Sequence, residues 1–230
     1  MNTFHRQLFD NETSTYTYLV ADPQTRLAVL IDPVREQVER DLALIDELGF
    51  ALAYVLETHV HADHITAAGE LRERTGAKTV AGALGAECAD LHLEHGDTID
   101  LGTVRIEALS TPGHTDDSMS FKVGEHLFTG DTLFIRGTGR ADFQNGDPVQ
   151  LYHSITDLLF ALPDATQVWP GHDYKGRTST TIGEEKRFNP RLAGKSLVEF
   201  VDIMNNLDLP APKKLAESVP ANRRCGHQAA

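Results

Sequence analysis

Three histidines and an aspartate fall within the seven residues Thr58–His64, which read THVHADH. Imidazole and carboxylate groups bind zinc, iron, manganese and nickel, and the absence of a thiolate disfavours a cysteine-rich structural zinc site. In an extended loop, His59 and His61 would point to the same side. The structural alternative, in which these side chains cap a helix or bind water, is weaker. Four polar, titratable groups without a common partner would be costly at one buried loop end.

The elements on either side of this loop suggest how it is positioned. Residues 51–56 form a short apolar run whose length and lack of helical period predict a buried strand. Residues 65–74, on the other side, are predicted to form a helix. The loop would then lie at the carboxyl end of a strand, where α/β sheets usually place their chemistry.

The succession of an apolar strand, a sharp turn and a metal-capable residue occurs three more times. It places His114, Asp131 and His172 after strands predicted at 104–109, 125–129 and 167–169. Gly130 and Gly171 directly precede two of these residues and allow the backbone to turn tightly. Each residue alone would more often be an ordinary loop or turn residue. Together with the first loop, they predict one shared metal centre.

The remaining elements continue an alternation of strands and helices. Strands are expected at 14–20, 28–31, 78–81 and 118–123, and helices at 38–48, 148–162, 181–187 and 196–206. Residues 82–95 favour neither type. We find no longer repeat, low-complexity tract or linker, so residues 1–230 are expected to form a single α/β domain.

Composition and net charge argue against several classes of partner and location. The formal net charge of −13 argues against nucleic acid or an anionic membrane as the main partner. No apolar run approaches the roughly 18 residues needed to span a bilayer, and the amino terminus has no pattern of a signal peptide or leader. Two cysteines are too few for a disulfide framework, so a reducing cytoplasm is the expected location.

Longer stretches around these residues resemble the persulfide dioxygenases, or sulfur dioxygenases, of the metallo-β-lactamase superfamily. The resemblance is carried by the histidine-rich loop, His114 and residues 130–144, 170–174, 184–186, 189–192 and 219–222. It implies an αββα four-layer sandwich with two mixed β-sheets and the metal between them. It also implies a mononuclear non-haem Fe(II) enzyme, with one iron per chain, that oxidises glutathione persulfide with O₂ and water to sulfite and glutathione. A homodimer is a further expectation.

The family's iron ligands match His59, His114 and Asp131, a set of two histidines and one carboxylate that leaves positions open for persulfide and O₂. The resemblance then gives outer, ligand-orienting roles to the remaining polar residues of the pattern, which are His61, Asp63, His64 and His172. Spacing alone leaves another arrangement open. The same residues could complete a dinuclear zinc site bridged by Asp131, as in hydrolases of this fold.

Several basic and aromatic residues are candidates for holding glutathione. Arg140 is favoured for a glutathione carboxylate because guanidinium binds carboxylate in a bidentate manner. The other candidates, each with a solvated surface role as its alternative, are Tyr174, Lys175, Arg177, Arg223 and Arg224.

The cysteines are not expected to take part in the chemistry. Some relatives carry a cysteine near the active site where this chain has Thr138, so a thiol role there is not expected. Cys88 is predicted to be a packed thiol and Cys225 an exposed one.

Two other functions compete with the dioxygenase. A glyoxalase II-type thioesterase would hydrolyse S-lactoylglutathione at a dinuclear site. Only 58 residues follow His172, which is short for the added helical domain of that family. A non-catalytic metal-binding or redox-sensing module is the second alternative, and loss of a ligand would be its expected sign. No ligand is missing from the pattern.

Overall fold

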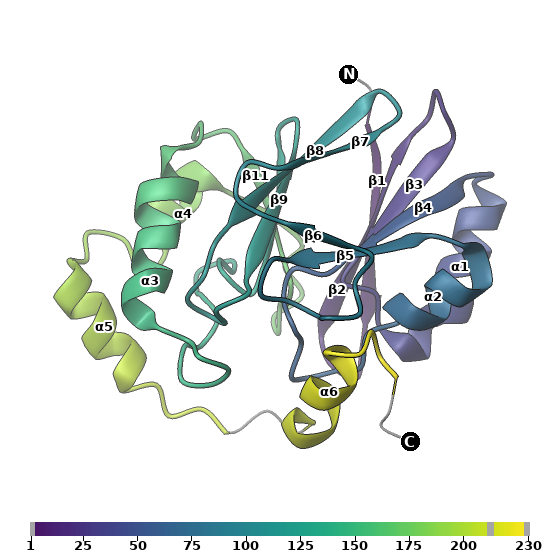
Figure 1. Cartoon of the computed structure of the whole chain (residues 1–230). Coiled ribbons are helices and arrows are strands. Elements are labelled where there is room, and N and C mark those ends of the chain that lie inside the picture. The colour runs from purple at the N-terminus through teal and green to yellow at the C-terminus, as the bar shows by residue number, and fades with distance from the viewer. Residues whose placement is uncertain (1–2, 211–213, 228–230) are drawn as a thin grey trace.

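Two six-stranded sheets form the centre of the computed structural model, which describes residues 3–210 and 214–227 (Figure 1). The first sheet has the strand order β1-β2-β3-β4-β5-β6 and the second β12-β11-β10-β9-β8-β7. Both sheets mix parallel and antiparallel pairs, so the predicted pair of mixed sheets is confirmed.

The first sheet is built in chain order from the amino-terminal part of the protein. Its strands are β1 (Phe4–Asp10), β2 (Thr15–Asp22), β3 (Leu27–Ile31), β4 (Ala51–Leu56), β5 (Lys78–Gly82) and β6 (Leu91–Leu93). Strands β3 and β4 pair in parallel, so their carboxyl ends meet at one edge of the sheet. Asp32 and Glu57, the residues that follow these two strands, are thereby brought to the same end as the histidine-rich loop.

The second sheet contributes the later ligand candidates. Its strands are β7 (Thr98–Leu101), β8 (Val104–Ser110), β9 (Met119–Val123), β10 (His126–Gly130), β11 (Gln167–Pro170) and β12 (Thr180–Thr181). Strands β10 and β11 pair in parallel, which places Asp131 beside the turn that carries His172. Gly130 has a φ of +47°, and a Cβ atom there would collide with the hydroxyl of Thr58. A glycine is therefore needed for the two sheets to approach each other here.

Helices cover the outer face of each sheet, as Figure 1 shows. Helices α1 (Val38–Glu47) and α2 (Ala68–Thr75) pack on the first sheet, and α3 (Pro148–His153), α4 (Ile182–Phe188) and α5 (Leu197–Asn205) on the second. The largest buried cluster lies between the sheets and includes Tyr18, Phe121 and Phe128. Three apolar layers thus separate four layers of secondary structure, which is the predicted αββα sandwich. None of the helices in the described ranges has the length and apolar character to cross a membrane.

Several elements differ from the sequence prediction. The helix expected at 65–74 begins at Ala68, because residues 65–67 continue the histidine-rich loop. The helix expected at 148–162 is α-helical only to His153, then forms a π turn and a 3₁₀ turn to Ala161. Strand β6 lies in the ambiguous segment 82–95, and β1 and α6 (Leu215–Asn222) were not predicted.

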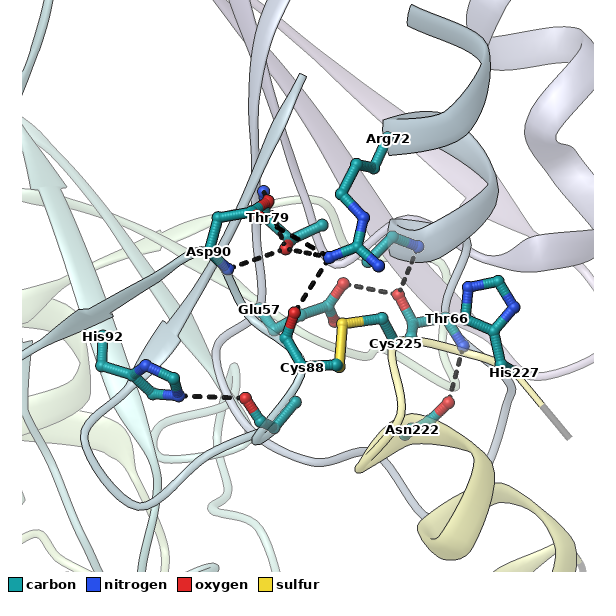
Figure 2. Close-up of a disulfide and its surroundings, with 12 residues drawn as sticks. Glu57, Thr66, Arg72, Thr79, Cys88, Asp90, His92, Asn222, Cys225 and His227 are labelled. Carbon is teal, nitrogen blue, oxygen red and sulfur yellow. Dashed lines mark hydrogen bonds and ion pairs between the residues drawn. A yellow bond between two sulfur atoms is a disulfide. The ribbon is translucent and has the colours of Figure 1, made fainter. Parts of the chain in front are cut away.

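The prediction that both cysteines are free thiols is wrong. Cys88 and Cys225 form a disulfide between residues 137 positions apart in the sequence, and Cys225 is buried rather than exposed (Figure 2). The loop between β5 and β6 and the end of α6 meet beside α2, where Arg72 donates to the carbonyl of Cys88 and Gly69 N–H donates to that of Cys225. This meeting depends on tertiary packing, which cysteine spacing does not reveal.

Candidate metal centre

His59, His114 and Asp131 meet between the two sheets. Their ligand atoms all lie within 4.8 Å of one another, and the distance from His114 Nε2 to Asp131 Oδ2 is 3.6 Å. We call these three residues the ligand cluster. His59 comes from the first sheet, and His114 and Asp131 come from the second. The centre therefore exists only where the carboxyl ends of strands from both sheets are brought together.

Both histidines of the ligand cluster are oriented by a neutral acceptor. His114 Nδ1 lies 2.7 Å from the carbonyl oxygen of Arg140, which can only accept, so Nδ1 carries the proton. His59 Nδ1 lies 3.0 Å from the hydroxyl of Thr58, which donates its own proton to Asp32 and accepts from His59. In both rings the Nε2 lone pair is left facing the centre. This is how a protein prepares imidazole to bind a metal.

A second group, the His61 cluster, consists of His61, Asp63 and His64, whose ligand atoms also lie within 4.8 Å of one another. Here the histidines are held by carboxylates. His61 Nε2 lies 3.2 Å from Asp32 Oδ1 and 3.1 Å from Glu57 Oε2. His64 Nδ1 lies 3.0 Å from Asp63 Oδ2. Each ring is therefore partnered by at least one negative charge.

His172 lies between the two clusters. Its Nδ1 donates to the carbonyl oxygen of Ser14, and its Nε2 lies 3.5 Å from Asp131 Oδ1 and 3.6 Å from Asp63 Oδ2. The four predicted outer residues are thus all within reach of the ligand cluster or of each other.

The two kinds of partner give the histidines opposite electrostatics. Burial lowers the pKa of His59 well below its ordinary 6.5, and His61 and His114 add to the effect. Burial acts the same way on His61, but the carboxylates of Asp32 and Glu57 outweigh it and raise its pKa well above 6.5. At neutral pH His59 is a neutral imidazole, the form that binds metal. The carboxylates beside His61 instead favour its protonated ring.

The residues present fit a metal ion. Asp131 Oδ1, His61 Nδ1 and His64 Nε2 are buried side-chain atoms without a hydrogen-bond partner in the described structure. Buried polar atoms are normally paired, so such a concentration at one point indicates that another group belongs there. Two histidines and a carboxylate match the donor set of a non-haem Fe(II) site.

The backbone of the histidine-rich loop is held from two sides. Val60 N–H donates to the carboxylate of Asp117 at 2.8 Å. Asp117 lies in the connection between β8 and β9 of the second sheet. Asn222 of α6 donates to the carbonyl oxygens of His61 and His64, both at 2.8 Å, and accepts from Thr66 N–H. The loop is therefore fixed partly by residues far along the chain.

Several of these supporting residues were not assigned a role from the sequence. No functional role was predicted for Asp32 or Glu57, although both directly follow apolar strands, as the ligand candidates do. Asp32 also has a φ of +52°, which is unusual for a residue other than glycine. Asn222 lies in a stretch that carried the family resemblance, yet no pattern at that position indicated a role.

The guanidinium of Arg140 is already paired. It contacts Asp142 through two hydrogen bonds of 2.6 and 2.8 Å, and it donates to the carbonyl oxygen of Pro210 at 2.7 Å. Its carbonyl oxygen is the acceptor that orients His114. In this structure, the residue therefore supports the centre through its backbone and fastens residues 209–210 through its side chain.

The other predicted substrate residues differ in availability. Tyr174 is 72 % exposed, and its ring stacks on that of His172 at a centroid distance of 5.9 Å. Lys175 is also exposed, whereas Arg177 forms an ion pair of 2.9 Å with the buried Asp173. Arg223 and Arg224 are exposed at the end of α6. Tyr174 therefore lies next to the ligand cluster through its contact with His172.

Comparisons with known proteins agree with this geometry. The model of the metallo-beta-lactamase superfamily matches residues 10–87 and 90–172. The human protein named persulfide dioxygenase ETHE1, mitochondrial, is 48 % identical over 97 % of this chain and 89 % of its own length. The crystal structure of ETHE1 from Myxococcus xanthus superposes with a TM-score of 0.97 at 60 % identity, covering 97 % of this chain and 100 % of that one.

A more distant solved structure is described with two irons. TTHA1623, described in a di-iron-bound form, is 30 % identical with a TM-score of 0.69, over 81 % of this chain and 100 % of that one. The much higher identity to the ETHE1 proteins, over nearly the whole length of both chains, decides the assignment. The protein belongs to the persulfide dioxygenase family of the metallo-beta-lactamase superfamily.

Proposed function

We propose that this protein is an Fe(II)-dependent persulfide dioxygenase with one iron per chain. The reaction consumes glutathione persulfide, O₂ and water and yields glutathione, sulfite and two protons. The observation that carries the proposal is the convergence of His59 Nε2, His114 Nε2 and the Asp131 carboxylate, in a chain of this family. Family membership also favours this reaction over the glyoxalase II alternative.

The protein's own residues would prepare the centre for this reaction. Bound Fe(II) would supply open coordination positions for a soft persulfide sulfur and for O₂. The acceptors on Thr58 and Arg140 hold the imidazoles of His59 and His114 in one orientation. His172, with carboxylates on two sides, is placed to hold a proton close to the reacting atoms.

We propose that Tyr174 and Lys175 contact the glutathione portion of the substrate. Both are exposed, and Tyr174 covers the ring of His172. Arg140 and Arg177 stay predicted substrate residues on one condition. Their guanidinium groups would first have to leave Asp142 and Asp173, respectively.

Three broader expectations accompany the proposal. The whole chain would act as one catalytic domain, because each sheet supplies part of the ligand cluster. The homodimer stays a prediction. The cytoplasmic location also stays a prediction. The disulfide removes one argument for it, because the two cysteines are not free thiols. In a reducing compartment, disulfides are usually transient or redox-sensing.

The test is metal content combined with two activity assays on one preparation. Protein purified without added metal should contain one iron per chain, take up O₂ only when glutathione persulfide is added, and release sulfite. S-lactoylglutathione should not be hydrolysed. Two metals per chain with thioester hydrolysis and no O₂ uptake would instead assign the protein to glyoxalase II chemistry.

A further inference from the structure

The last described segment of the chain reaches back to the metal-binding loop. Asn222, at the end of α6, is 2 % exposed and is bonded to the backbone of His61, His64 and Thr66. Its side chain uses both amide hydrogens and its oxygen in these contacts. A single amide side chain about 160 residues later in the sequence therefore fixes the conformation of residues 61–66. All of its hydrogen-bonding groups are occupied by these contacts.

This segment is fastened to the rest of the protein by the Cys88–Cys225 disulfide, three residues after Asn222 (Figure 2). In Figure 2 the disulfide lies between the loop that carries Cys88 and the chain leaving α6, next to Thr66 and Glu57. Glu57 accepts a hydrogen bond from Thr66 and also pairs with His61. One short path of direct contacts thus connects the disulfide to the surroundings of the ligand cluster.

Around the disulfide, the segment also makes non-covalent contacts with the body of the protein. Cys225 accepts a hydrogen bond from Gly69, and Gly226 packs against the carbonyl oxygen of Thr66. A hollow of about 530 Å³ borders the segment and is lined by Thr66, Cys225 and His227, among other residues. Cys225 is itself buried, so a small thiol would reach the bond through this hollow.

We propose that the segment 215–227 is a redox-dependent brace that positions the metal-binding loop. When the disulfide is closed, Asn222 is held against the loop, and metal is retained. Two glutathione molecules would reduce the bond, giving two protein thiols and one glutathione disulfide, and the brace would loosen. Glutathione is also a product of the proposed reaction, so the inference rests on that proposed function for its physiological reductant.

The sequence makes this bond easy to isolate experimentally. Cys88 and Cys225 are its only cysteines, so a thiol reductant has one protein target. The Cys88→Ser variant removes the covalent link without altering the side chain of Cys225 or Asn222. Glu87→Ala, at the exposed neighbouring position, is the matched control that keeps the link. Asn222→Asp would remove the donor to two loop carbonyls with the disulfide intact.

Two measurements are made on oxidised and glutathione-reduced protein. Hydrogen–deuterium exchange follows the peptides that contain residues 57–69, and the release of bound Fe(II) to a chelator gives the metal off-rate. Reduced wild type, Cys88→Ser and Asn222→Asp should exchange faster in these peptides and release metal about tenfold faster, the lower end of effects seen for outer-sphere residues. Glu87→Ala should behave as wild type. Glutathione should change nothing further in Cys88→Ser.

The proposal is overturned if reduced wild type and Cys88→Ser match oxidised wild type in either measurement. The two measurements distinguish failure of this proposal from failure of the proposed function. If the protein bound Fe(II) without oxidising persulfide, the off-rates would still be measured. If it bound no Fe(II), the off-rate would be measured with Co²⁺ or Zn²⁺, and the exchange data need no metal.

Discussion

The ligand cluster and the His61 cluster contain the same residue types within a few ångströms, yet they are built for different tasks. In the ligand cluster, the second nitrogen of each histidine meets a hydroxyl or a carbonyl oxygen. In the His61 cluster, it meets carboxylates. A neutral acceptor leaves a neutral ring with a free lone pair. A carboxylate stabilises the protonated ring, as the raised pKa of His61 shows.

The comparison shows that a histidine's metal-binding role depends on the partner of its other nitrogen as much as on its distance from the centre. The motif THVHADH supplies three rings without distinguishing them. Asp32 and Glu57, from outside the motif, make the distinction. On this basis, a chain can retain all the residues of a two-metal site and still favour one metal.

Removing a member of the ligand cluster should have the largest effect. His59→Ala, His114→Ala and Asp131→Ala should each lose bound iron and persulfide-dependent O₂ uptake, because two remaining ligands cannot hold Fe(II) against solvent. Metal analysis after desalting measures the first effect and an oxygen electrode the second. His153→Ala, at an exposed surface ion pair, should retain both. Full iron occupancy in any of the three variants would contradict the assignment of the cluster.

Replacing a neutral acceptor should weaken the centre without destroying it. Thr58→Val removes the hydroxyl that orients His59 while keeping a side chain of similar shape. Metal affinity should fall roughly 10–100-fold, as is usual when an outer partner of a ligand is lost. Competition with a chelator of known affinity measures the change. An unchanged affinity would mean that His59 is oriented by packing alone.

Neutralising a carboxylate beside His61 should move the His61 cluster toward metal binding. Glu57→Gln keeps the size of the side chain, and the pKa of His61 should fall because a nearby negative charge is lost. A neutral His61 could then join Asp63 and His64 in taking up a second metal. Titration with excess metal, monitored by calorimetry, should show a second binding event that is absent from wild type. A single event in both proteins would contradict this explanation of the metal count.

The smallest effect is expected outside both clusters. Tyr174→Ala should raise the KM for glutathione persulfide several-fold, about 1 kcal/mol in binding free energy for an exposed aromatic contact, with iron content unchanged. Steady-state kinetics with parallel metal analysis separates the two quantities. Phe188→Ala removes an equally exposed aromatic ring elsewhere and should leave KM unchanged. Loss of iron in Tyr174→Ala would instead show that the ring stabilises the metal centre and does not act by contacting the substrate.

Most strands and the meeting of the ligand residues followed from local patterns, whereas the sandwich of two mixed sheets was implied by the family resemblance. Apolar runs ending at a glycine or a polar residue predicted strands whose ends carry His59, Asp131 and His172, and those ends do meet. The pattern worked because parallel strands align their carboxyl ends at one edge. Strand β1 was missed because its seven residues include no buried apolar side chain, and only Asp10 is fully buried.

The distinctions within the site could not be predicted in the same way. Whether His61 faces a carboxylate depends on Asp32, which lies 29 residues away on another strand. Asn222 and the disulfide depend on contacts between segments separated by more than 130 residues. Arg140 was chosen for the chemistry of its side chain, which in the structure is occupied by Asp142. Spacing indicates which elements meet but not which atoms become partners.

The position of Asn222 also bears on the order of events during synthesis. The two loop carbonyls it holds belong to residues 161 and 158 positions earlier in the chain. At roughly 5–20 residues per second, the histidine-rich loop would leave the ribosome roughly 8–30 s before its amide partner. The nascent first sheet would meanwhile display its imidazoles without Asn222. Metal captured early would be held by an incomplete site, and selection for the correct ion would fall to the final stage of folding.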